Sequence, residues 1–321
     1  MPSVNKLVSV CITWILAAAM AVPALPQEPP AQSGTIKSQV NLVNLFVTVR
    51  DKNKRIVGDL KKEDFKIFED GQEQQIAFFS KEVNLPITLA VLLDTSGSEQ
   101  DMLGAVQDAG GRFLDRVLRK GDEALVMSFD TDVDLLADFT DDRKLLDRGI
   151  RSARINAPMG GGIINTGPIP SSNTRGTALY DAIYLASTEK LSSEAGRKAI
   201  VIVTDAEDTG SKVRLEEAIE AAQRTDTVVH ILLVADPRFG GNGGVAHKIT
   251  DETGGRTISV RSEKNLEDAF NQISEELRSQ YTLGYYPANT THDGKFRKIK
   301  IDMSNHDLKI LARKGYYAPK G

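Results

Sequence analysis

The strongest constraint on the fold is an alternation of short apolar segments with longer amphipathic ones between residues 85 and 280. PITLAVLLD, KAIVIVTD and TVVHILLVAD are near-continuous apolar runs, which is typical of strands buried on both faces of a parallel sheet. After the first run, apolar residues recur at spacings of three and four, which predicts a helix with one buried face. These residues are Leu103, Val106, Gly110, Phe113 and Val117.

The rest of this region continues the alternation. EALVMSFD, DLLADF and RTISV have strand character, whereas RKLLDRGIRSAR, TALYDAIYLASTEKL, VRLEEAIEAAQRT and VAHKITDETG have helix character. The last helix, NLEDAFNQISEELRSQ, is predicted to begin with Asn265 as its N-cap. Residues 85–280 are therefore predicted to form one α/β domain, doubly wound, with a mainly parallel sheet covered on both faces.

Short strands are predicted on both sides of this domain, in residues 36–83 and 281–321. The first segment contains Asp70-Gly71, a strong two-residue hairpin signal, and the second contains YTLGYYP, KFRKIKIDM and LKILARKGYYAP. Each segment is too small to bury a core alone. Because the two ends of a domain usually lie close together, we expect both flanks to form one small β unit.

The N-terminal residues have the pattern of an export signal. An uncharged apolar run, residues 7–25, follows Lys6 and contains small residues near its end. Cleavage after Ala21 or Ala24 would release it, while an uncleaved run of this length would just span a bilayer. We predict a signal peptide over 1–24, a linker over 25–35 and an extracytoplasmic location, either secreted, periplasmic or membrane-anchored by residues 7–25.

Composition excludes several classes of function. The chain has 40 Lys and Arg against 44 Asp and Glu, so its net charge of -4 provides no field that attracts nucleic acid. Aromatic residues make up 6%, which argues against a surface that stacks bases. The single cysteine, Cys11, excludes disulfides within the chain and a cysteine-ligated zinc site.

Oxygen-bearing side chains follow two of the predicted buried strands. Asp94-Thr95-Ser96-Gly97-Ser98 ends the first strand, and Asp205 ends another. Thr177 precedes a helix between them. Because ligands of an open α/β sheet bind at the carboxyl ends of its strands, we expect two carboxylates and three hydroxyls to converge. These hard oxygen donors suit Mg²⁺.

Three motifs, DTSGS, RGTALYDAI and IVTDAED, occur in this order on the predicted strands and helices. Together they resemble the von Willebrand factor type A (VWA) domain over about residues 85–280, a Rossmann-like fold with a metal-ion-dependent adhesion site (MIDAS). The flanks VTVRDKNKRIVGDLKKEDFKIFEDGQEQQIAFF and ARKGYYAP resemble those of the bacterial VWFA-related proteins, which are exported.

The resemblance implies a role for each of five residues. Ser96 and Ser98 would bind the metal through their hydroxyls, and Thr177 would bind it directly or through water. Asp94 and Asp205 would bind it directly or hold metal-bound waters. In the family, an Asp or Glu carboxylate of a partner protein fills the remaining position. The ion implied is Mg²⁺, with Mn²⁺ and Ca²⁺ as alternatives.

Two residues depart from the family pattern. Glu99 stands where methionine is common, and we expect it to face solvent at a helix N-terminus, where an acid is favoured. The alternative is that Glu99 acts as an internal pseudo-ligand of the metal. Ala206 stands where glycine is common, which we expect to be a mild change.

The pattern favours a non-enzymatic module that binds a partner protein through the metal. One alternative is a metal-dependent hydrolase, which needs a general base near the ion, and Glu99 is the unexplained acid there. Another is a structural envelope protein with a stabilising metal. Asp208-Thr209-Gly210 matches an aspartic-protease triplet, but that enzyme needs two such loops. The glycine-rich loop 155–176 borders Thr177 and is expected to select the partner.

Overall fold

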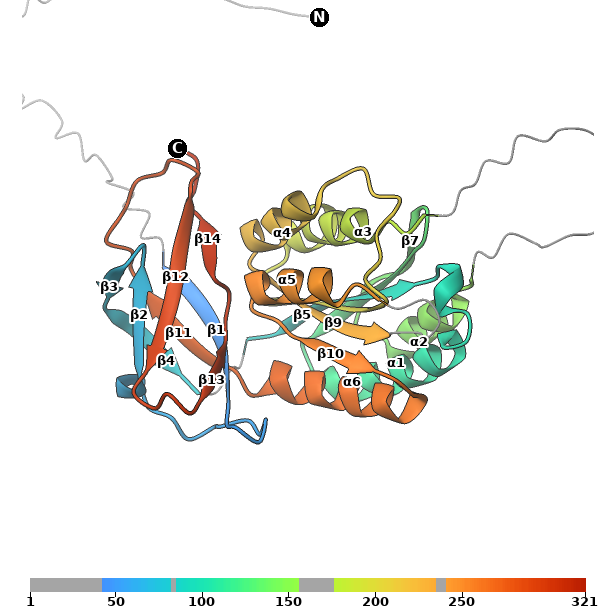
Figure 1. Cartoon of the computed structure of the whole chain (residues 1–321), viewed down its shortest axis with the longest axis horizontal. Coiled ribbons are helices and arrows are strands. Elements are labelled where there is room, and N and C mark those ends of the chain that lie inside the picture. Colours follow the sequence, from blue (N-terminus) through green and yellow to red (C-terminus); the bar gives the residue numbers. More distant parts are fainter. Residues whose placement is uncertain (1–41, 82–84, 156–175, 235–240) are drawn as a thin grey trace, which may run out of the picture. The chain divides into compact units, whose positions relative to one another are not determined.

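A computed structural model describes residues 42–81, 85–155, 176–234 and 241–321 (Figure 1). The predicted signal peptide, the predicted linker and nearly all of the loop 155–176 lie outside these residues. Within the described ranges, no helix is both long enough and apolar enough to cross a membrane.

A six-stranded sheet forms the centre of the α/β part, with the strand order β10-β9-β8-β5-β6-β7. Each neighbouring pair is parallel except β6 with β7, which confirms the predicted mainly parallel sheet. All eight residues of β5 are buried, as its apolar run predicts. The strands are β5 (Ile87–Asp94), β6 (Glu123–Phe129), β7 (Val133–Thr140), β8 (Arg197–Thr204), β9 (Thr227–Val234) and β10 (Thr257–Val260).

Six α-helices cover the two faces of this sheet in the described residues (Figure 1). Buried side chains of α1, α2 and α6 pack on one face, and those of α3, α4 and α5 pack on the other. The doubly wound arrangement is therefore confirmed. The helices are α1 (Leu103–Val117), α2 (Arg143–Ser152), α3 (Leu179–Leu185), α4 (Leu215–Arg224), α5 (Gly243–Thr253) and α6 (Glu263–Arg278).

The start of α6 differs from the prediction. The Ser262 hydroxyl accepts a hydrogen bond from the Asn265 N–H, and the helix begins at Glu263. Asn265 is therefore the third residue of the helix and not its N-cap. Serine and asparagine are both good N-caps, and the extended backbone of Ser262 decides between them.

The two flanks form one β unit of two four-stranded sheets, ordered β13-β1-β11-β4 and β14-β12-β2-β3. Each sheet combines strands that precede the α/β part with strands that follow it, since β1 pairs with β11 and β2 pairs with β12. The prediction that the flanks pack together is confirmed. The strands are β1 (Val43–Arg50), β2 (Phe65–Glu69), β3 (Gln72–Gln74), β4 (Ile76–Ser80), β11 (Tyr281–Tyr285), β12 (Phe296–Met303), β13 (Lys309–Leu311) and β14 (Gly315–Tyr317).

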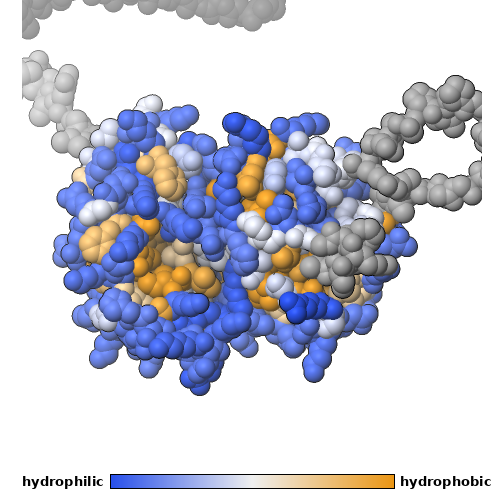
Figure 2. Space-filling view, viewed as in Figure 1, coloured by the Kyte–Doolittle hydropathy of each residue, from blue (hydrophilic) through white to orange (hydrophobic). Residues whose placement is uncertain are grey.

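The β unit has its own apolar core, which both flanks supply. Leu45 and Ile67 from the first flank and Leu283 from the second are fully buried in it. Asp70 and Gly71 both have positive φ, as the predicted hairpin turn between β2 and β3 requires. The face of the molecule in Figure 2 is largely hydrophilic, with apolar patches over the β unit and over the α/β part.

A buried ion cluster joins β1 to α6. Glu276 of α6 is 1% exposed, and its Oε1 accepts hydrogen bonds from Arg50 of β1 and, at 2.6 Å, from Arg256. His230 of β9 lies beside it, with Nδ1 3.9 Å from the second carboxylate oxygen of Glu276. Burial lowers the pKa of His230. Two guanidinium groups therefore compensate the one buried carboxylate of this cluster.

Candidate metal site

Two neighbouring strands bring the predicted carboxylates to one edge of the sheet. Asp94 is the last residue of β5, and Asp205 directly follows β8. The two strands are parallel, with Leu93 opposite Val203, so their carboxyl ends coincide. Asp94 and Asp205 are 3% and 6% exposed. The sheet thus buries two acids side by side, as the alternation of strands and helices predicts.

The DTSGS segment folds back on Asp94. The Ser96 N–H donates a hydrogen bond of 2.9 Å to Asp94 Oδ1, and the hydroxyls of Ser96 and Ser98 lie 3.0 Å apart. A short 3₁₀ turn, Gly97–Glu99, follows Ser96. The Thr95 N–H donates to the Phe129 carbonyl at the end of β6, which fixes the segment to the sheet. Asp94, Ser96 and Ser98 are therefore held together.

Burial dominates the electrostatics of Asp94. It raises the pKa of Asp94 to about 6, and the charge of Asp205 adds to the rise. Hydrogen bonds from Ser96 and from the Thr204 hydroxyl, which lies 2.6 Å from Asp94 Oδ2, oppose it. At neutral pH the carboxylate is thus ionised against a desolvation penalty, and a bound cation would offset that penalty.

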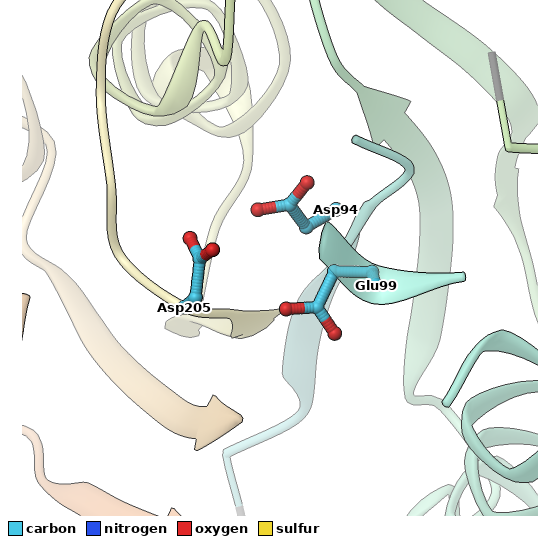
Figure 3. A group of neighbouring side chains, drawn as sticks. All are labelled: Asp94, Glu99 and Asp205. Atoms are coloured by element: carbon cyan, nitrogen blue, oxygen red, sulfur yellow. The ribbon is translucent and has the colours of Figure 1, made fainter. Parts of the chain in front are cut away.

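Glu99 is buried beside these two acids, and the expectation that it faces solvent is wrong. It is 2% exposed, and one oxygen from each of Asp94, Glu99 and Asp205 lies within 4.8 Å of the others. Figure 3 shows the three carboxylates gathered around one space. The 3₁₀ turn explains the difference, because it places Glu99 before α1 begins and turns its side chain toward the strand ends.

Thr177 is held near the strand ends through its backbone. Its N–H donates to the Thr209 hydroxyl, and its carbonyl accepts from the N–H groups of Thr209 and Gly210, all at 3.1 Å. Gly176 and Gly210 allow this approach, since a Cβ on Gly176 would lie 3.1 Å from the Gly210 Cα. Hydrogen bonds therefore attach Thr177 to the loop after Asp205. Asp94, Ser96 and Ser98, by contrast, are hydrogen-bonded to one another.

Sequence reasoning missed three residues that shape this site. Thr204 orients Asp94 through its hydroxyl, and Thr209 holds Thr177. Asp208 accepts hydrogen bonds from the Tyr180 N–H of α3 and from the Ser211 hydroxyl. The signal was present in the segment VTDAEDTG, because hydroxyl and acidic side chains after a buried strand are suited to bind neighbouring loops.

The donor set fits a hard divalent cation. Three carboxylates and two serine hydroxyls are all oxygen donors, which Mg²⁺, Mn²⁺ and Ca²⁺ prefer. Metal–oxygen bonds of about 2.0–2.6 Å let one ion bridge oxygens up to about 5 Å apart. The separations among Asp94, Glu99 and Asp205 fall within that limit. Three buried acids close together also supply the negative charge that such an ion requires.

Comparison with known proteins assigns the domain. The sequence profile of the von Willebrand factor type A domain matches residues 89–208, a span that contains all five predicted ligands. The chain contains a von Willebrand factor type A domain. The six-stranded sheet with helices on both faces is the fold of this VWA domain, and the β unit is additional to it.

Two solved structures of low sequence identity share the fold, and a third gives a weaker match. A von Willebrand factor type A protein from Catenulispora acidiphila matches at a TM-score of 0.50 and 11% identity, covering 88% of this chain and 75% of its own. Proximal thread matrix protein 1 from the mussel byssus matches at 0.50 and 13%, covering 65% and 51%, so this chain spans about half its length. BatB from Bacteroides thetaiotaomicron matches at 0.45 and 21%, covering 60% and 100%. A search of curated proteins finds no match.

Proposed function

We propose that this protein is a non-enzymatic binding module that holds a divalent cation in its VWA domain and uses it to bind a carboxylate of a partner protein. The observation that carries the proposal is the gathering of buried carboxylates and serine hydroxyls at the carboxyl ends of β5 and β8. Asp94, Ser96, Ser98, Thr177 and Asp205 would hold the ion. We expect Mg²⁺, with Mn²⁺ or Ca²⁺ as alternatives.

The ion would supply a positive centre that attracts an incoming Asp or Glu side chain. Neighbouring residues of the chain hold the acidic ligands of the ion in place. Ser96 and Thr204 fix the rotamer of Asp94, and the Glu207 N–H fixes Asp205 by donating to its Oδ1 at 3.0 Å. Such fixed acids hold an ion in one place, so that its open side points in one direction.

A binding role is favoured over hydrolysis by the position of Glu99. A hydrolase needs a general base that reaches a substrate or an attacking water. Glu99 is the acid that the sequence leaves available for this role, yet it is 2% exposed and faces Asp94 and Asp205. That position suits charge balance around an ion better than proton exchange with a substrate.

We propose that binding takes place outside the cytoplasm, because residues 7–25 have the pattern of an export signal. The partner is identified by its chemistry alone, as a protein that presents an Asp or Glu carboxylate. Neither a nucleic acid nor an intrachain disulfide enters the proposal, since the charge balance and the single cysteine give no basis for them.

Calorimetric titration with Mg²⁺ and Mn²⁺ tests the metal. We expect binding by the wild type and at least tenfold weaker binding by Asp94→Asn, because a fixed carboxylate ligand is lost. Asp134→Asn is the matched control, since it removes the same charge from an exposed position on β7 and should not change the affinity. Equal affinities in all three proteins would contradict the proposal.

Capture from the native envelope separates the binding module from a structural protein with a stabilising metal. An immobilised wild-type protein should retain specific proteins in Mg²⁺ and release them in EDTA. The Asp94→Asn protein should retain none of them. Retention that is the same with EDTA, or with Asp94→Asn, would show that the metal does not carry the contact.

A further inference from the structure

We propose that His230, Arg50 and Glu276 form a pH-sensitive latch, which holds the β unit on the VWA domain at neutral pH and releases it on acidification. Arg50 lies on β1 of the β unit, whereas His230 lies on β9 and Glu276 on α6 of the VWA domain. The latch involves none of the five candidate metal ligands, so this inference is independent of the proposed function.

The contact between the β unit and the VWA domain, here called the joint, contains no apolar cluster shared by both parts among the described residues. The β unit buries one cluster and the VWA domain buries one on each face of its sheet. Charged side chains form contacts across the joint instead. Arg313 pairs with Asp226, and the Arg224 guanidinium lies 4.0 Å from the centre of the Tyr317 ring. The joint can therefore open while the apolar cores of both parts stay intact.

His230 is enclosed at this joint, on the face of β9 that α6 covers. Its side chain is 2% exposed, and neither ring nitrogen has a hydrogen-bond partner within the described ranges. Leu232, two residues further along β9, points to the same face and packs in the cluster that includes buried residues of α6. A proton added to this imidazole would thus be buried without an acceptor to hold it.

The charged groups that face His230 are Arg50 from β1, Arg256 directly before β10 and Glu276 from α6, while β8 places the apolar Val201 beside it. Nδ1 of His230 lies 3.9 Å from Oε2 of Glu276, which is beyond hydrogen-bond distance. The other oxygen of Glu276 already accepts from both guanidinium groups. Burial is the main reason that the pKa of His230 is lowered. Glu276 opposes this shift, and Arg256 and Arg50 add to it.

Protons therefore favour the open joint. In the closed form His230 stays neutral at a pH where a solvated histidine, with a pKa of about 6.5, already takes up a proton. When β1 and Arg50 move away, water reaches the imidazole and the proton binds. The ratio of open to closed molecules should increase by up to about tenfold for each pH unit below 6.5, and should level off once the closed form is protonated as well.

Distances between two spin labels, measured by pulsed electron paramagnetic resonance, report on the joint. The labels are attached to Lys66→Cys on β2 and Lys264→Cys on α6, which are exposed positions, and Cys11→Ser removes the single native cysteine. The protein with the native latch should give one narrow distribution at pH 7.5 and a second, broader one that grows between pH 6.5 and 5. A distribution that does not change over this range would overturn the inference.

His230→Gln removes the titrating group, so its distribution at pH 5 should match that at pH 7.5. His247→Gln is the matched control, because His247 is exposed on α5, and this variant should open on acidification as the native latch does. The titration of Asp94 is common to all these proteins and cancels in the comparison. If His230→Gln opens at pH 5 to the same extent as His247→Gln, the inference is overturned.

Arg50→Met tests the latch at neutral pH. It removes the contact of β1 with Glu276 but leaves Arg256 paired with that carboxylate, so the broader distribution should be at least tenfold more populated at pH 7.5. In the wild type, ¹³C NMR should show a neutral His230 imidazole at pH 6 in the closed form. An Arg50→Met protein that stays closed, or a protonated His230 in the closed form at pH 6, would overturn the inference.

Discussion

Two of the buried clusters of charged side chains in the described residues differ in how their charge is balanced. At Glu276, one carboxylate is surrounded by the guanidinium groups of Arg50 and Arg256. At the ends of β5 and β8, three carboxylates lie together within 4.8 Å. The first cluster is complete within the chain. The second gathers acids at the carboxyl ends of two strands, which makes it the candidate cation site.

Removal of the acid should therefore have opposite consequences in the two clusters. Glu276→Gln leaves the guanidinium groups of Arg50, which is buried, and Arg256, which is partly buried, without their carboxylate and should destabilise the protein by about 3–5 kcal/mol. Asp94→Asn, in EDTA, relieves repulsion among buried acids and should raise the stability. Urea unfolding measures both. Glu275→Gln, at an exposed position beside Glu276 on α6, should change the stability little. A destabilisation of Asp94→Asn as large as that of Glu276→Gln would break the comparison.

The stability of the metal-free protein should depend on pH through Asp94. The pKa of Asp94 is about 6 in the folded chain and 3.8 in the reference state, so the folded protein binds this proton more tightly than the unfolded chain. Without metal, the contribution of Asp94 to stability should rise as pH falls from 7 towards 4, and should level off below the unfolded pKa. Above pH 6 Asp94 is ionised, and the desolvation of its buried charge then lowers the stability in full.

Metal binding should show the reverse dependence, because the proton and the ion compete for Asp94. We expect the Mn²⁺ affinity to fall by up to about tenfold per pH unit below pH 6. Calorimetric titrations at pH 7, 6 and 5 measure this slope, and Asp94→Asn should reduce it. A constant affinity across this range would show that Asp94 does not bind the ion.

The smallest effect on metal affinity is expected from substitution of Thr204, whose hydroxyl donates a hydrogen bond to Asp94. Thr204→Val removes the hydroxyl that donates to Asp94 and should weaken Mn²⁺ binding by about 1 kcal/mol, or about fivefold. Thr204→Ser keeps the hydroxyl and should restore most of the affinity. Equal titration curves for the two variants would indicate that the ion, and not Thr204, sets the orientation of Asp94.

The arrangement of strands was predictable because it depends on periodicity. Apolar runs predict buried parallel strands, and that alone places Asp94 and Asp205 at one edge. The pairing of the two flanks was predictable because each flank is too small to bury a core alone. The direction of the Glu99 side chain was not predictable from the sequence. It depends on whether the segment around Ser98 forms a regular helix or a 3₁₀ turn. The Glu276 cluster was missed for another reason, since β1, β9 and α6 meet only in the folded chain.

The interleaving of both flanks in the β unit has a mechanical consequence. The VWA domain is an insertion between β4 and β11, so tension applied at the two ends of the described chain passes through the antiparallel ladders β1·β11 and β2·β12. These ladders would resist extension before the load reached β5 or the DTSGS segment. During synthesis, β1 and β4 must wait for roughly 200 more residues before β11, the strand with which both pair, exists.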